Sequence, residues 1–115
     1  MANTLFHNPR CSKSRQAKQL LDATGVEYQT VEYLKTPLTK GEIKDVLAKL
    51  GLKPRDILRT KEPEYQGLGL GDPSVSDEKI LSAIESNPVL LERPIFIKGN
   101  KAVIGRPPER VKELL

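Results

Sequence analysis

The sequence is poor in the residues that build disulfides, metal sites and aromatic platforms. Its 115 residues include one cysteine, one histidine and no tryptophan, and only 4% of them are aromatic. A single cysteine excludes an internal disulfide and any multi-cysteine zinc or iron–sulfur site within one chain. Few aromatic side chains argue against a surface that stacks the bases of single-stranded nucleic acid. We therefore expect the chain to bind no metal and no cofactor.

Long apolar runs are also absent. No stretch approaches the ~18 apolar residues of a membrane-spanning helix, and the beginning of the sequence lacks a secretory signal region. With 37% apolar and 30% charged residues, the composition is typical of a globular protein with one modest core. We expect a single domain over residues 1–115, no membrane partner, and a cytoplasmic location, where a lone thiol stays reduced.

The net charge of +4 is concentrated around the cysteine. Residues 1–21 contain no acid and four cations, so the rest of the chain sums to zero; these cations are Arg10, Lys13, Arg15 and Lys18. One interpretation is a solvated basic helix face. The other is a set of cations that stabilises a thiolate and receives an anion. Because no basic excess lies elsewhere, we expect no nucleic-acid partner.

Hydrophobic spacing predicts an α/β fold. The expected elements are strands at 4–7, 26–33, 94–97 and 101–104, helices at 12–24, 39–50, 54–59, 76–86 and 107–115, and a loop at 60–75. The first two strands are joined by a helix and should be parallel with a right-handed crossover. A tight turn at Gly99-Asn100 joins the last two strands as a hairpin. The prediction is a mixed sheet of about four strands with helices on its faces.

Cys11 is expected between the first strand and the first helix, which is a favourable place for a reactive thiol. The unpaired N–H groups at the start of a helix attract anions and favour a thiolate. A fall of the thiol pKa by ~2 from ~8.5 would make the thiolate the majority form at neutral pH and corresponds to ~2.7 kcal/mol. The alternative is that Cys11 is a small buried apolar residue.

Residue spacing excludes two familiar cysteine chemistries. Ser14 stands where a Cys-x-x-Cys dithiol needs its second cysteine, and Ala17 stands where a tyrosine-phosphatase loop needs its arginine. His7 is either a base or a group that tunes the thiol, or a strand histidine with satisfied hydrogen bonds. Because the chain has one cysteine, an adduct at Cys11 must be resolved by a thiol from another molecule.

The segment His7-Asn-Pro-Arg-Cys11-Ser-Lys-Ser-Arg15 resembles the glutaredoxin-dependent arsenate reductase family, in its bacterial arsenate-reductase-like branch. The resemblance continues through Leu58-Arg59, Glu92-Arg93-Pro94-Ile95 and Gly105-Arg106-Pro107. It implies a thioredoxin-like fold, with a mixed four-stranded sheet, flanking helices and a mostly helical insertion at approximately residues 34–92. It also implies a cis peptide bond before Pro94.

The resemblance further implies that Cys11 attacks arsenate while three arginines hold the oxyanion. These arginines are Arg59, Arg93 and Arg106. Guanidinium groups stay charged and bind tetrahedral oxyanions through paired hydrogen bonds. Without the resemblance, each arginine would be interpreted as a surface salt-bridge partner. The resemblance also implies supporting roles for five residues, namely His7, Asn8, Ser14, Arg15 and Pro94. Asn8 would brace the loop, and Ser14 would form a hydrogen bond with the thiolate.

The partners that the resemblance implies are arsenate or a similar oxyanion, glutathione as co-substrate, and glutaredoxin. One departure is Ser12-Lys13, where the resistance enzymes tend to have Gly-Thr, and this leaves a substrate other than arsenate open. Two other functions also stay open. One is a different glutathione-linked thiol oxidoreductase. The other is a non-catalytic regulator that binds transcription machinery, although Ser14 removes the dithiol that such regulators usually carry.

Overall fold

The two ends of the chain together build one mixed sheet. The structure is a computed structural model that describes residues 3–115. In chain order the elements, with η for 3-10 helices, are β1 (Thr4–Phe6), α1 (Ser12–Thr24), β2 (Gln29–Val31), α2 (Lys40–Leu50), η1 (Pro54–Ile57), α3 (Pro63–Gly67), α4 (Asp77–Ser86), η2 (Pro88–Leu90), β3 (Ile95–Lys98), β4 (Lys101–Ile104) and η3 (Pro108–Leu114). Among these helices, none has the length and apolar character to cross a membrane.

The elements fall into two compact units. The first unit contains the chain up to Thr36 and the segment Arg93–Leu115, and the second contains Pro37–Glu92. The first unit therefore holds all four strands, α1 and η3, and the second holds the remaining helices. The expectation of a single domain over residues 1–115 stays a prediction.

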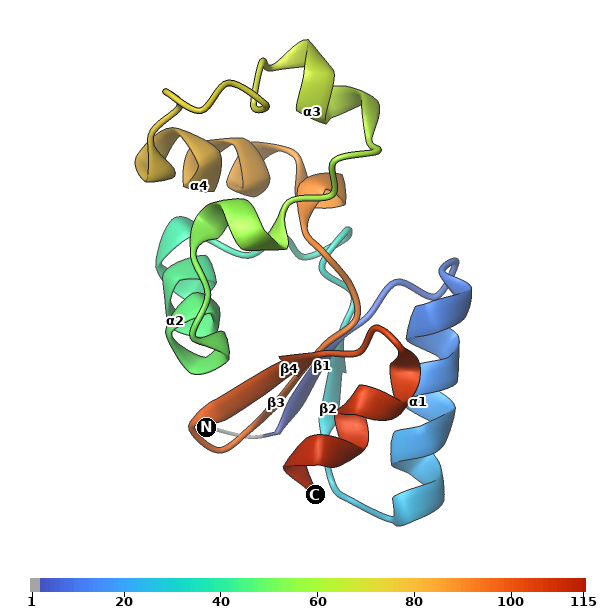
Figure 1. The fold of residues 1–115 in the computed structure, drawn as a ribbon. Helices are drawn as coiled ribbons and strands as arrows, with labels where there is room; N and C mark the ends of the chain where they lie inside the picture. Colours follow the sequence, from blue (N-terminus) through green and yellow to red (C-terminus); the bar gives the residue numbers. More distant parts are fainter. Residues whose placement is uncertain (1–2) are drawn as a thin grey trace. The chain divides into compact units, whose positions relative to one another are not determined.

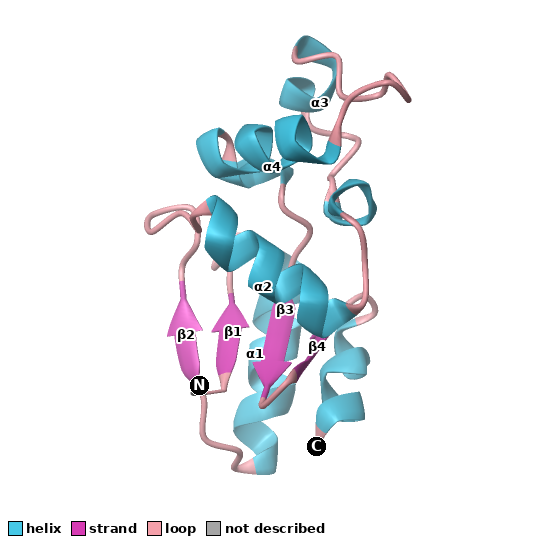
Figure 2. Cartoon of the chain, turned by 90° about the vertical axis from the view of Figure 1, so that its left-hand side faces the viewer, coloured by secondary structure: helices cyan, strands magenta, loops and turns pink. Residues whose placement is uncertain are grey.

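The sheet of the first unit has the strand order β2-β1-β3-β4 (Figures 1 and 2). Strand β1 runs parallel to β2 and antiparallel to β3, so that Leu5 lies opposite both Thr30 and Phe96. Strands β3 and β4 form an antiparallel hairpin whose turn contains Gly99 at φ 63°. A mixed four-stranded sheet with a parallel first pair and a terminal hairpin confirms the predicted topology.

Helix α1 and the terminal helix η3 pack against each other beside the sheet (Figure 1). Helix α1 buries Ser14, Ala17 and Leu21, which recur every three or four residues and therefore lie on one helical face. Their partners in the core include Phe96 at 0% exposure and Val111 from η3. This packing fixes the start of α1, and hence Cys11, against the ends of the strands.

The second unit is organised around α2 and α4. Helix α2 begins at a capping box, in which Thr39 Oγ accepts from the N–H of Glu42 at 3.2 Å and Glu42 Oε1 accepts from the N–H of Thr39 at 3.0 Å. The N–H of Lys40 donates to Glu85 Oε2 of α4 at 2.8 Å, which ties the two helices together. The predicted capping box and the start of α4 after Ser76 are both confirmed.

Several predicted elements differ from the structure. The segment 60–75, predicted as loop, contains the short helix α3. This helix begins with Pro63 in its first turn and buries no residue. Its sequence therefore lacks the helical spacing of apolar residues from which a helix is predicted. The second strand covers only Gln29–Val31 rather than 26–33. The predicted helices at 54–59 and 107–115 are both of the tighter 3-10 type and cover Pro54–Ile57 and Pro108–Leu114.

Candidate active site at Cys11

Cys11 is the N-cap residue of α1 and lies at the end of a tight turn. Its N–H donates to the carbonyl of Asn8 at 3.0 Å, and its own carbonyl accepts from the N–H of Arg15 at 3.0 Å. The backbone of Cys11 is extended, at φ −91° and ψ 124°, which is the usual N-cap conformation. The thiol is therefore held where the unpaired N–H groups of the helix are directed.

The surroundings of the thiol favour the thiolate. Partial burial raises the pKa of Cys11, but hydrogen bonds from the N–H of Ser14, the Arg93 side chain and the N–H of Lys13, together with the charge of Arg93, lower it from 9.0 to about 7. About half of the thiol is then ionised at pH 7, against about 1% at a pKa of 9. The predicted reactive thiol thus has a physical basis in both the helix start and an arginine.

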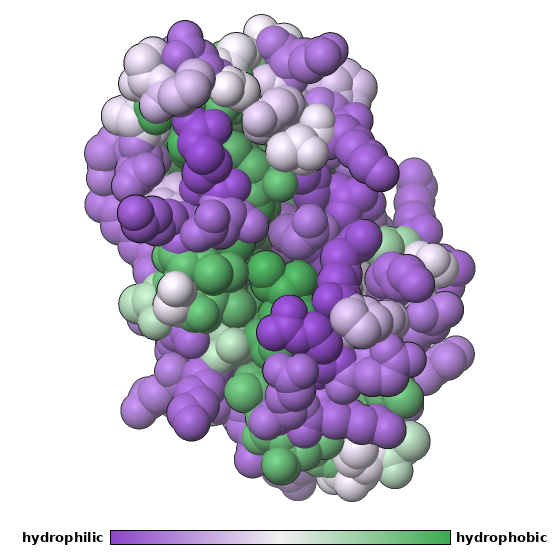
Figure 3. Space-filling view, in the orientation of Figure 1, coloured by the Kyte–Doolittle hydropathy of each residue, from purple (hydrophilic) through white to green (hydrophobic). Residues whose placement is uncertain are grey.

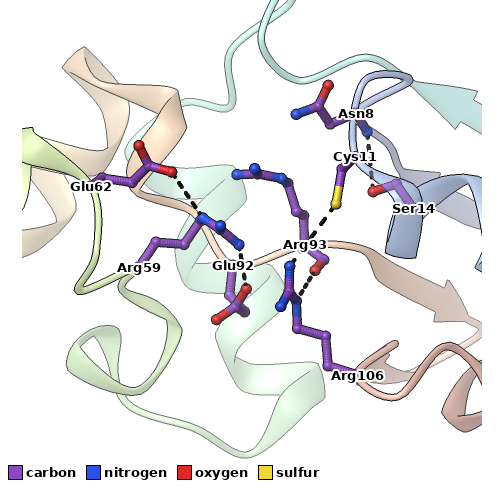
Figure 4. A network of polar contacts seen from close by, with 8 residues as sticks. All are labelled: Asn8, Cys11, Ser14, Arg59, Glu62, Glu92, Arg93 and Arg106. Atoms are coloured by element: carbon purple, nitrogen blue, oxygen red, sulfur yellow. Dashed lines mark hydrogen bonds and ion pairs between the residues drawn. The ribbon is translucent and has the colours of Figure 1, made fainter.

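Arg93 and Arg106 meet the thiol from the opposite end of the sequence (Figure 4). Arg106 Nη2 lies 3.9 Å from Cys11 Sγ, and Arg106 Nε donates to the carbonyl of Arg93 at 2.7 Å. The hydrogen bond to the carbonyl of Arg93 orients the side chain of Arg106. The structure thereby brings together Cys11 and two of the three arginines that the family resemblance selects.

Each of these two arginines precedes a cis proline. The peptide bond between Arg93 and Pro94 is cis, as the resemblance implies, and the bond between Arg106 and Pro107 is also cis, which we did not expect. Gly105 packs beneath this segment, because a Cβ at that position would lie 2.9 Å from Pro94 Cγ. The backbone that carries the two guanidinium groups is thus closely packed.

The turn before Cys11 is braced by polar contacts. Asn8 Oδ1 accepts from the N–H of Arg10 at 3.0 Å, and the N–H of Asn8 donates to Ser14 Oγ at 3.4 Å (Figure 4). Arg15 Nη1 donates to the carbonyl of Pro9 at 3.0 Å. Ser14 therefore has two roles in the site: its backbone N–H donates a hydrogen bond to the Cys11 thiolate, and its hydroxyl accepts one from the N–H of Asn8 in the turn.

His7 is buried at 6% exposure behind the same turn. Burial lowers its pKa, and the charges of Lys18 and Arg15 lower it further against the opposing effect of Glu32. The imidazole is therefore mostly neutral at pH 7. Within residues 3–115 its Nδ1 atom has no hydrogen-bond partner, so the interpretation of a fully satisfied strand histidine does not hold for this atom.

Arg59 belongs to the second unit and forms ion pairs there. Its Nε lies 3.2 Å from Glu62 Oε1 and its Nη1 lies 2.9 Å from Glu92 Oε1 (Figure 4). Its side chain is 18% exposed, so the paired carboxylates hold a mostly buried guanidinium. Arg59 thus forms the kind of salt bridge that is expected of an arginine without the family resemblance. Its binding of an oxyanion stays a prediction.

Comparison with known proteins decides the family. The sequence pattern of the ArsC family matches residues 6–114. The chain belongs to the ArsC family. Among its ArsC relatives are "Uncharacterized protein YfgD" of Escherichia coli K12 and an "Arsenate reductase" of Neisseria meningitidis serogroup A, each 46% identical over 112 residues that cover 96% of this chain and 94% or 96% of the relative. The solved "Arsenate reductase from Vibrio cholerae" is 41% identical, with a TM-score of 0.96 over 100% of this chain and 98% of that one.

These ArsC relatives confirm the arsenate-reductase-like family that the sequence resembles. They also confirm the thioredoxin-like fold, because the similarity to the Vibrio cholerae structure extends over the whole chain.

Tyr33 is a residue of the ArsC site that the sequence reasoning missed. It is fully buried, and its interaction with Arg93 raises the pKa of that guanidinium against the effect of burial. Tyr33 follows β2, whose neighbour β1 leads into Cys11. Because parallel strands place their carboxyl ends at one edge of a sheet, this topology is the signal that could have identified Tyr33.

The surface around the ArsC thiol is polar and cationic. Arg10, Lys13 and Arg15 are exposed, and Figure 3 shows mainly hydrophilic side chains over α1, on the right of the view. Across residues 3–115 there is no group of three His, Cys, Asp or Glu side chains that could hold a metal ion.

Proposed function

We propose that this chain is an arsenate reductase, an oxidoreductase that converts arsenate to arsenite with Cys11 as nucleophile. The observation that carries the proposal is the environment of the thiol: a pKa of about 7, with Arg93 hydrogen-bonded to it and Arg106 Nη2 3.9 Å from Sγ. The names of the Neisseria meningitidis and Vibrio cholerae relatives support the same substrate.

In the first step the Cys11 thiolate attacks arsenic(V). A sulfur–arsenic bond forms, one arsenate oxygen takes up a proton and leaves as water, and the oxidation state of arsenic does not change. Arg93 and Arg106 would hold the remaining oxygens, because guanidinium groups bind oxyanions bidentately and keep their charge. Preorganised cations of this kind stabilise the charge that moves among the oxygens during attack.

The second step is proposed to use glutathione and glutaredoxin, since the chain has a single cysteine and cannot resolve its own adduct. The glutathione thiol displaces a second oxygen as water and forms its own bond to arsenic. A glutaredoxin thiolate then attacks the glutathione sulfur, and the electron pair of the sulfur–arsenic bond passes to arsenic, which becomes arsenic(III). The products are a glutathione–glutaredoxin disulfide and a Cys11–arsenic(III) adduct, which water hydrolyses to arsenite and the free thiol.

Two further parts complete the proposal. Arg59 is proposed as a third oxyanion ligand because it occupies its matching family motif, which is Leu58-Arg59. The cytoplasm is proposed as the location because a free reactive thiol needs a reducing compartment.

The decisive experiment is arsenate-dependent oxidation of NADPH, coupled through glutathione, glutaredoxin and glutathione reductase. We expect turnover by the natural sequence, loss in Cys11→Ser and Arg106→Met, and full activity in Arg110→Met, a matched control at an exposed arginine of the same unit. Turnover no greater than that of Cys11→Ser would refute the function.

Two further arms of this assay test the details. Replacing glutathione and glutaredoxin with thioredoxin and its reductase should abolish turnover, and equal turnover would refute the proposed coupling. Turnover of a glutathionylated substrate in the absence of arsenate would favour another thiol oxidoreductase.

A further inference from the structure

A pocket of about 240 Å³ lies beside the turn that leads to Cys11. It is lined by residues 7–10, which follow β1, and by Glu32, Leu34 and Lys35, which follow β2. All of these residues belong to the first unit. The carboxyl ends of adjacent parallel strands are where α/β sheets commonly bind ligands. The pocket thus has the position of a ligand site, and the oxyanion chemistry of Cys11 does not account for it.

The charges at the pocket select an anionic group. Arg10 and Lys35 are cations and Glu32 is an anion, and Lys35 Nζ lies 3.5 Å from Glu32 Oε1. His7 adds no charge because it is mostly neutral at pH 7. The lining therefore has a net charge of +1, which one carboxylate would balance.

The size of the pocket limits the ligand. At ~30 Å³ per water molecule, the pocket holds the equivalent of about eight waters. This space suits a carboxylate with a short stem, and the rest of a tripeptide would lie outside the pocket. Pro9 and Leu34 supply apolar walls against which the stem can pack.

The pocket is within reach of the reacting sulfur. Asn8 lines the pocket, and its carbonyl accepts from the N–H of Cys11 at 3.0 Å, so the two residues are the ends of one turn. The ends of such a turn lie within ~7 Å of each other. In a tripeptide whose central residue carries the thiol, the two residues from that position to one end extend over ~7 Å. A peptide thiol whose sulfur is at the Cys11 adduct can therefore place a terminal carboxylate in the pocket.

We propose that this pocket binds a terminal carboxylate of the small thiol that resolves the Cys11 adduct, with Arg10 and Lys35 as its cationic partners. The inference rests on the proposed function, in which glutathione supplies that thiol. It adds the place where the thiol is held before it attacks, and it assigns this place to the segments after β1 and β2.

Binding can be measured without catalysis. The Cys11→Ser protein would be titrated with S-methylglutathione, which cannot form a bond to sulfur or arsenic, while amide NMR shifts are followed. We expect shifts at Arg10, Leu34 and Lys35. Arg10→Gln and Lys35→Gln should each raise the dissociation constant about threefold to tenfold, because each removes one cation from a partly solvated site. The matched control Lys101→Gln removes an exposed cation from the β3–β4 hairpin and should leave binding unchanged.

Masking the carboxylates tests the chemistry of the ligand. The diethyl ester of S-methylglutathione should lose the shifts at the pocket, whereas equal binding of the ester would overturn the proposal. Shifts confined to residues outside the pocket would overturn it as well.

The outcomes for this pocket and for the arsenate activity separate cleanly. Arsenate turnover without ligand shifts at the pocket overturns the pocket assignment and leaves the function intact. Pocket shifts that depend on Arg10 and Lys35, in a protein without arsenate turnover, support the pocket as a thiol site and refute arsenate as the substrate.

Discussion

Arg93→Met should raise the pKa of Cys11 from about 7 toward its ordinary value of 9.0. Four interactions lower this pKa, namely two backbone N–H groups and the hydrogen bond and charge of Arg93, and they outweigh the effect of burial. Methionine keeps much of the length of the side chain but removes both contributions of the arginine. We expect the pKa to rise from about 7 to ~8, which corresponds to at most ~1.4 kcal/mol, since solvent screens a half-buried site. The thiolate fraction at pH 7 would fall from ~50% to ~10%.

The assay is the ultraviolet absorbance of the thiolate as a function of pH, with the Cys11→Ser protein subtracted as background. The rate of alkylation by iodoacetamide, measured over the same pH range, gives an independent value. Arg110→Met is the control, because Arg110 is exposed and pairs with Glu113 on η3. An unchanged pKa near 7 in Arg93→Met, with the fold intact by circular dichroism, would show that the helix N–H groups suffice and that our account of Arg93 is wrong.

Three further predictions concern stability, each measured by urea unfolding. Gly105→Ala should cost about 1–3 kcal/mol, because its Cβ would lie 2.9 Å from Pro94 Cγ and 3.1 Å from Val111 Cγ1; an unchanged midpoint would show that this packing relaxes freely. Thr39→Ala should cost about 1 kcal/mol by removing the cap of α2, and Thr39→Ser should restore most of it. Because the pKa of Cys11 is lower in the folded protein, the thiolate stabilises the fold fully above pH 9, and this stabilisation is lost as the pH falls through about 7. The free energy of unfolding of the natural protein, relative to that of Cys11→Ser, should therefore increase by at most ~2.7 kcal/mol from below pH 7 to above pH 9. A difference that does not change with pH would contradict the lowered pKa.

The elements that the sequence predicted correctly have strong local signals. Gly25 with φ 74° follows the last residue of α1, and Gly51 with φ 69° follows the last residue of α2, so glycine marks both boundaries. The Thr39 capping box fixes the start of α2 in the same way. By contrast, α3 packs no side chain into a core, and local spacing therefore carries no information about it.

The candidate site was only partly predictable because its members come from distant parts of the chain. The position of Cys11 at a helix start follows from the neighbouring strand, turn and helix patterns. Arg106 lies 95 residues away in sequence, and only the family resemblance pairs it with the thiol. Tyr33 has no motif of its own, and its contact with Arg93 depends on the parallel pairing of β1 with β2.

A thiol pKa near 7 suits the attack of Cys11 in the proposed reaction. A thiol attacks as its thiolate, so a pKa of 9 would leave only about 1% of Cys11 reactive at pH 7. A much lower pKa would also slow attack, because the nucleophilicity of a thiolate falls with its pKa, and the best attacking thiol has a pKa near the ambient pH. Burial opposes the N–H groups and Arg93, and the balance holds the pKa of Cys11 at about 7. Partial burial therefore contributes to the reactivity of this site by limiting how far the cations and the helix start can lower the pKa.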